Sequence, residues 1–228
     1  MRVNAQQPIL RRSTLSLSAP VSPRLPTVSP TLQPDRSTRD ISHLAVWRVS
    51  TAKQGNGTTL LLLLVFSPYT NKQNIQIQAG AKMLRDGRED TYWQSDGAQP
   101  HTIILEFQRL VTLSGIALFV DYKLDESYTP QRISVRTGTR ETNVKEIRQV
   151  ELKEPQGWVL IPLTHPDTQL PYIKAFRMEV VILANHQNGR DTHVRQLRVF
   201  GPRTDQVKAL GFPISFTSLE FNQVAFVR

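Results

Sequence analysis

Short β-type segments separated by turn residues dominate the sequence beyond residue 100. Stretches rich in Val, Ile, Leu, Phe and Thr alternate there with groups of Gly, Pro, Asn and Asp, and helical periodicity is weak. The expected strands are Thr102–Phe107, Leu113–Val120, Gln131–Thr137, Gly157–Pro162, Ala175–Leu183 and Thr192–Gly201. Ser42–Ser50 suits either a strand or an irregular segment. Several short strands closed by turns predict an all-β sandwich.

Composition divides the chain into three parts. Residues 1–38 mix recurrent prolines with Ser, Thr and Arg, and such a segment buries too little apolar surface to offset its chain entropy, so we expect a disordered tail. Residues 39–203 carry the strand pattern and form the expected domain. Residues 204–228 hold apolar anchors without a clear period. We expect a docking tail there, with an edge strand or a frayed end as the alternative.

The residue inventory excludes several kinds of chemistry. No cysteine is present, which excludes a disulfide framework, a thiolate metal site and a cysteine nucleophile. The histidines lack the spacing typical of zinc sites. Asp125, Glu126, Asp191 and His193 could be combined into an acid–base site, but no nucleophile motif or phosphate-binding loop accompanies them. We therefore expect no catalysis, cofactor or metal.

The net charge of +9 is not arranged as in a nucleic-acid-binding protein. Residues 1–40 hold six arginines and two aspartates, hence +4 of the total, and no stripe of Lys and Arg interleaved with aromatic residues follows. The strongest apolar run, Leu60–Phe66, is far shorter than the roughly 20 residues of a membrane span. Arg11 and Arg12 interrupt any signal-peptide core. We expect a protein of the nucleus and cytoplasm that binds neither nucleic acid nor membranes.

Three segments carry a specific family resemblance. They are DTYWQSDGAQPH at Asp90–His101, DYKLDESYTPQRISV at Asp121–Val135 and LANHQNGRDTHVRQ at Leu183–Gln196. Together, in this order and spacing, they closely resemble the Doc domain, the tenth subunit of the anaphase-promoting complex. Shorter supporting matches are Ala45–Trp47, Glu146–Leu152 and Glu154–Trp158. The resemblance spans about residues 40–57 and 81–201.

One segment departs from the family pattern. In the family, the stretch matching Lys53–Gly57 runs almost directly into the stretch matching Ala81–Asp86, whereas Thr58–Gly80 intervenes here. This insert has an apolar run followed by Asn and Gln residues. It is either translated intron or a lineage-specific surface loop, and we favour the first because an exposed apolar run promotes aggregation.

The resemblance implies both a fold and a role. The fold is a jelly-roll β-sandwich similar to galactose-binding domains, with function concentrated in the loops at one end. The role is that of a non-catalytic substrate-recognition subunit, a co-receptor for the destruction-box degron together with a WD40 coactivator, which promotes processive ubiquitination in mitosis. The implied partners are the other subunits of the complex, the coactivator and destruction-box substrates.

Polar residues of the second and third segments are the expected substrate contacts. They are Ser127, Tyr128, Asn185, His186, Gln187, Asn188, Arg190 and Asp191. Ser127 and Asn185 can both donate and accept hydrogen bonds, and His186 and Gln187 add further donors. Asn185, His186 and Ser127 are the favoured contacts among them. Short extended peptides are held by such bonds and by a few pockets.

Neighbouring residues have structural alternatives. Arg190 and Asp191 either touch substrate or form ion pairs that shape the loop. For His193 we expect a structural hydrogen bond, and for Trp93 and Trp158 packing in the core or at the rim.

The last two residues also match the family, whose members end in an Ile-Arg tail that docks into a tetratricopeptide-repeat scaffold subunit. Val227 and Arg228 resemble that tail, with Val in place of Ile. A β-branched side chain fills an apolar pocket, while a guanidinium and a carboxylate take paired, charge-assisted hydrogen bonds.

A different class of function competes with this interpretation. β-Sandwiches of this kind often bind sugars, and Tyr92, Trp93 and Tyr128 could stack on a sugar ring. A carbohydrate-binding module is therefore the alternative hypothesis.

Overall fold

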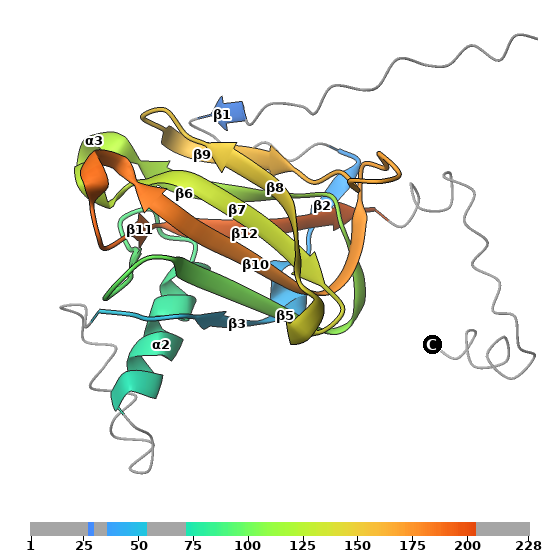
Figure 1. Cartoon of the computed structure of the whole chain (residues 1–228), viewed down its shortest axis with the longest axis horizontal. Coiled ribbons are helices and arrows are strands. Elements are labelled where there is room, and N and C mark those ends of the chain that lie inside the picture. Colours follow the sequence, from blue (N-terminus) through green and yellow to red (C-terminus); the bar gives the residue numbers. More distant parts are fainter. Residues whose placement is uncertain (1–26, 30–35, 54–71, 204–228) are drawn as a thin grey trace, which may run out of the picture.

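The computed structural model describes residues 27–29, 36–53 and 72–203. Within them the chain is mostly β-strand (Figure 1). The strands are β1 Thr27–Ser29, β2 Thr38–Asp40, β3 Ala45–Val49, β4 Trp93–Gln94, β5 His101–Leu113, β6 Gly115–Asp121, β7 Pro130–Gly138, β8 Lys145–Glu151, β9 Gln156–Pro162, β10 Ile173–Asn185, β11 His193–Val194 and β12 Gln196–Pro202. The helices are α2 Lys72–Met83 and α3 Tyr122–Asp125, with short 3₁₀ turns η1 Ser42–Leu44, η2 Glu126–Tyr128, η3 Glu141–Asn143 and η4 His186–Asn188.

Two five-stranded antiparallel sheets form the sandwich, which confirms the predicted all-β fold. The first sheet has the order β1-β9-β6-β12-β2 and the second the order β3-β5-β10-β7-β8. The long strand β10 pairs with β5 on one side and with β7 on the other. A third, two-stranded sheet joins β4 to β11 at the end of the sandwich.

Alternation along the strands builds the core. On β5, Ile103 and Leu105 point inward and are fully buried, as are Leu118 on β6 and Val180 on β10. Side chains of successive residues point to opposite faces of a strand, so one face of each sheet is lined with apolar residues. The two lined faces meet between the sheets and give a single continuous core.

The segment expected as one strand over Thr192–Gly201 is divided into β11 and β12. β11 pairs with β4, whereas β12 pairs with β6 and β2. The chain changes partner at Arg195, whose amide donates to the carbonyl oxygen of Phe119 at 3.1 Å. No local sequence pattern marks this change, because it depends on which strand lies alongside.

The end of the predicted insert is part of a packed helix. Residues 58–71 lie outside the described residues, but residues 72–80 belong to α2, which packs on β3 and β4. A Cβ atom on Gly80 would lie 2.7 Å from Cδ1 of Trp93 and 3.1 Å from Cβ of Ala52. Trp93 is fully buried there and its indole donates to the carbonyl oxygen of Thr51 at 2.8 Å. The proposed insert boundary at Gly80 therefore cuts through a structural element.

The N-terminal segment contributes a short strand that its composition does not predict. Thr27–Ser29 form β1 on the edge of β9, within residues 1–38, because backbone pairing with an edge strand requires no apolar pattern. Most of that segment and the tail 204–228 lie outside the described residues. Among the residues that are described, no helix is long and apolar enough to span a membrane.

The contact between α2 and Trp93 predicts a position-specific response to substitution. Gly80→Val should lower the free energy of unfolding by about 1–3 kcal/mol through overpacking against Trp93. Gln78→Val is the matched control, since it places the same β-branched residue on the same helix at an exposed position. Chemical denaturation measures both, and equal losses would contradict the packing of α2 on Trp93.

Candidate functional site

The three family-like segments converge at one end of the sandwich. Thr192 donates its amide to the hydroxyl oxygen of Ser95 at 2.7 Å, and the amide of Ser95 donates to the carbonyl oxygen of Thr192 at 3.0 Å. Gln99 donates to the carbonyl oxygen of Gly189 at 2.8 Å. We call the loop 95–100, residues 122–129 and the loop 186–192 together the rim. Its loops are joined mainly through backbone groups, so they form one surface.

A close backbone approach fixes the turn at residues 186–189. A Cβ atom on Gly189 would lie 1.9 Å from the carbonyl oxygen of Ser127, which only glycine avoids. Gln187 and Asn188 before it have positive φ angles of 52° and 57°, a conformation that asparagine tolerates better than most residues. The sequence Asn188-Gly189 thus seats η4 directly on η2.

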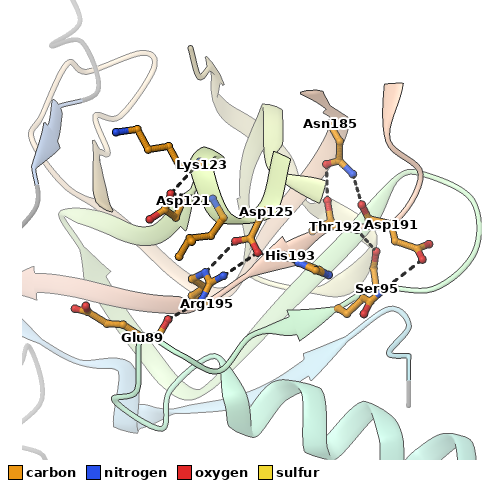
Figure 2. Close-up of polar contacts among 12 residues, drawn as sticks. Glu89, Ser95, Asp121, Lys123, Asp125, Asn185, Asp191, Thr192, His193 and Arg195 are labelled. Atoms are coloured by element: carbon orange, nitrogen blue, oxygen red, sulfur yellow. Dashed lines mark hydrogen bonds and ion pairs between the residues drawn. The ribbon is translucent and has the colours of Figure 1, made fainter. Parts of the chain in front are cut away.

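Asn185 is placed at the base of the rim rather than on its surface. It is buried, its amide donates to the carbonyl oxygen of Asp191 at 2.7 Å, and its side-chain oxygen accepts from the hydroxyl of Thr192 (Figure 2). In this arrangement Asn185 shapes the loop 189–192. Ser127, another of the three favoured contacts, is half-buried against Gly189.

His186 is also enclosed. Its ring lies 4.8 Å from that of Tyr122, whose hydroxyl accepts a hydrogen bond from Gln187 at 3.0 Å. Burial lowers the pKa of His186 below its ordinary value, against the opposing effect of the Glu154 charge. The imidazole is therefore neutral near pH 7 and packs as an aromatic ring.

The remaining predicted contacts lie at the surface of the rim. Gln187, Asn188 and Arg190 are exposed, as is Tyr128, with 39% of its surface accessible. Asp191 is half-buried and forms an ion pair with Lys53 at 3.2 Å. Of Arg190 and Asp191, Asp191 thus forms an ion pair within the domain, while Arg190 is exposed. Val227 and Arg228 lie outside the described residues.

A buried ion pair lies beneath the rim. Asp125, at the end of α3, accepts hydrogen bonds from Nε and Nη2 of Arg195 at 2.9 and 2.8 Å (Figure 2). Its carboxylate also contacts Nδ1 of His193 at 3.0 Å. Burial alone would raise the pKa of Asp125, but the hydrogen bonds from His193 and Arg195 outweigh it and hold the pKa below its ordinary value. Arg195 further donates to the carbonyl oxygen of Glu89 at 2.9 Å.

An aromatic stack continues from this ion pair to the surface. The ring of His193 lies between those of Tyr92 and Tyr128, with centroid separations of 4.1 and 4.3 Å. The guanidinium of Arg195 lies 5.5 Å from the centroid of Tyr92, within range of a cation–π interaction. His193 thus has the expected structural hydrogen bond. Tyr128, at the rim, and Tyr92, beside it, each remain partly exposed.

Sequence reasoning did not assign this cluster. Asp125 entered only as part of an acid–base alternative, a structural hydrogen bond was expected for His193 without a named partner, and Arg195 was not singled out. They lie 68 to 70 positions apart in the chain, so no spacing pattern connects them. Of the residues in the acid–base alternative, Asp125 and His193 lie in contact, whereas Asp191 pairs with Lys53. Within the described parts of the chain, no group of three or more His, Cys, Asp or Glu could hold a metal ion.

The ion pair predicts a pH-dependent stability difference. Asp125→Asn should lower the free energy of unfolding by about 3 kcal/mol at neutral pH, because Arg195 stays buried without its counter-charge. Because the pKa of Asp125 is depressed in the folded state, its ionised form stabilises the fold at pH values above the ordinary pKa of 3.8. The difference in the free energy of unfolding between wild type and Asp125→Asn should therefore reach its full value above about pH 5 and shrink as the pH falls.

Urea denaturation across that pH range measures the effect. Asp90→Asn is the control, because Asp90 pairs with Arg88 at an exposed position and surface pairs contribute little. A difference between wild type and Asp125→Asn that is constant from about pH 3 to 7 would contradict the role of the ionised Asp125.

Solved structures share the fold with low sequence identity. A family 32 carbohydrate-binding module from Clostridium perfringens, in complex with galactose, has a TM-score of 0.51 and 10% identity, covering 72% of this chain and 98% of that one. A pair of such modules from the same organism, in complex with GalNAc, has a TM-score of 0.54 and 13% identity, covering 82% and 42%. These similarities confirm the galactose-binding-like jelly roll.

A family model and curated relatives give the identity. The model described as "Anaphase-promoting complex, subunit 10" matches residues 73–225, and so includes residues 73–80 of α2. Anaphase-promoting complex subunit 10 of Bos taurus is 43% identical over 164 residues, covering 72% of this chain and 75% of the relative. The Schizosaccharomyces pombe relative of the same name is 33% identical over 182 residues, covering 80% and 84%. The chain therefore belongs to the family of anaphase-promoting complex subunit 10.

Proposed function

We propose that this chain is the non-catalytic substrate-recognition subunit of an anaphase-promoting complex, acting in the nucleus and cytoplasm. In this role the rim is the co-receptor for the destruction box, which it shares with a WD40 coactivator. The observation that carries the proposal is the meeting of all three family-like segments on one surface, with Tyr128, Gln187, Asn188 and Arg190 exposed there.

The rim has the chemistry expected of a peptide co-receptor. Its exposed side chains offer amides, a guanidinium and a phenol, which bond to a peptide backbone and to polar side chains. The loops beneath are fixed by Gly189, Asn185 and the Asp125–Arg195 pair, so little conformational freedom is lost on binding. A weak contact of this kind gains strength when the same ligase complex holds the substrate elsewhere.

Substitution of exposed rim residues tests this role. Tyr128→Ala combined with Arg190→Ala should reduce processive ubiquitination of a destruction-box substrate by about 3- to 10-fold in the reconstituted complex, a loss of roughly 1 kcal/mol of binding. Arg109→Ala with Leu110→Ala is the matched control, because both residues are exposed and lie on β5 far from His101 at its rim end. Substrates that lack a destruction box should be unaffected.

Equal activity of the two double variants would contradict the assignment of the rim to substrate. The competing function is sugar binding, favoured by the exposed rings of Tyr92 and Tyr128. A glycan array separates the two, since specific binding abolished by Tyr128→Ala would support the carbohydrate-binding alternative.

The terminal residues give a second prediction. Deletion of Arg228 should reduce recovery of this chain with the other subunits, because the proposed scaffold pocket would lose a guanidinium and a terminal carboxylate in the right position. Arg228→Lys should give intermediate recovery, since it keeps the charge without the planar fork. Quantitative mass spectrometry after affinity purification measures both, and unchanged recovery of the deletion variant would refute docking through Val227-Arg228.

A further inference from the structure

The outer face of the first sheet carries an apolar cluster that is separate from the core. Its members, here called the outer cluster, are Ala117, Phe119, Trp158, Leu160 and Phe200. Strand pairing sets Phe119 beside Trp158 and Ala117 beside Leu160. The inward positions of the same strands are taken by core residues such as Leu118 and Val159, so alternation places the cluster on the opposite face.

The outer cluster is covered rather than exposed. Phe119, Trp158 and Phe200 are each at most 9% accessible, although they point away from the core. The rings of Phe119 and Trp158 meet edge to face at 5.3 Å. Helix α2 packs on β3 and β4, which lie outside this sheet, so it does not supply the cover. An uncovered aromatic patch on this face would favour association or aggregation.

The two ends of one short segment lie at opposite edges of this sheet. β1 pairs with β9 at one edge and β2 pairs with β12 at the other, with β6 in the middle. Residues 30–35 therefore connect a strand on one side of the sheet to a strand on the other. The inner face is filled by the core, which leaves the outer face as the direct route.

The length of the connection leaves little slack. Four inter-strand steps of about 4.8 Å give roughly 19 Å across the sheet. Ser29 pairs with Trp158, which pairs with Phe119, which in turn pairs with Gln196 on β12. Thr38 pairs with Pro202 on β12. Pro202 lies six residues beyond Gln196, or about 20 Å along the strand. The diagonal is roughly 28 Å, and nine residue steps reach at most about 32 Å. A straight line between these ends passes over Leu160, Ala117 and Phe200.

The composition of the connection suits such a path. Pro30 and Pro34 favour extended backbone and lack the amide donors that would go unpaired on a sheet face. Leu32 lies midway between them and is the one large apolar residue of the segment. We propose that the outer cluster is the docking surface for residues 30–35 of the same chain, with Leu32 packed on it.

Disulfide trapping tests this assignment, and the absence of native cysteine makes the result unambiguous. Leu32→Cys combined with Leu160→Cys in the full chain should form an intramolecular disulfide under mild oxidation, because a disulfide requires Cα atoms within about 7 Å. Thr31→Cys and Gln33→Cys with the same partner cover a shift of one residue. Leu32→Cys with Ile104→Cys is the control, since Ile104 is similarly half-buried but lies on the second sheet.

Non-reducing mass spectrometry should show at least about tenfold more disulfide with position 160 than with position 104, as expected for proximity over random encounter. No disulfide from any of the three positions would overturn the proposal. Disulfide-linked dimers would assign the surface to a second copy, and trapping of Phe216→Cys by Leu160→Cys would assign it to the C-terminal tail.

A variant without introduced cysteine tests the docking of Leu32 independently. Leu32→Asp should increase amide exchange in β6 and β9, while Gln33→Asp should change it much less. Equal exchange in both variants, in proteins of unchanged circular dichroism, would also overturn the docking of Leu32.

Discussion

The ion pair between Asp125 and Arg195 joins the parts of the molecule that carry the rim. Arg195 occupies the junction between β11 and β12, where the chain leaves β4 and joins β6. Asp125 is held at the end of α3, directly before the turn that contains Ser127 and Tyr128. Because both charges are buried, each requires the other, and the pair fixes the position of η2 relative to the second half of the rim.

The buried residues around this ion pair hold the surface residues of the rim in place. His193 contacts Asp125 on one side and carries the rings of Tyr92 and Tyr128 on its two faces. The loop 189–192 is held from below by Asn185 and from the side by Gln99. The exposed polar groups of the rim are consequently carried by loops that hydrogen bonds within the domain hold in place.

Local pattern was sufficient for most of the sandwich but not for the site. The β-branched and other apolar residues of Gln131–Thr137 and Ala175–Leu183 predicted β7 and β10, because such residues are enriched in strands. The resemblance placed function in the loops at one end of the sandwich, and the three polar segments meet there. The burial of Asn185 and His186 was not predictable, because it depends on loops distant in sequence folding over them. Helix α2 was missed for a related reason, since its Gly80 is explained only by Trp93 lying against it.

The contact between Gly189 and Ser127 changes how genetic variation at this end of the molecule should be interpreted. Two peptide groups more than sixty positions apart touch without an intervening side chain, so any side chain at position 189 would displace the loop that carries Ser127. A variant of Asn185 or Ser127 that abolishes substrate binding would then report the cost of reorganising the surface rather than a lost direct contact. Conservation of such positions among relatives would likewise reflect the demands of backbone fit, and a contact surface inferred from alanine scans would include residues that lie beneath the true surface.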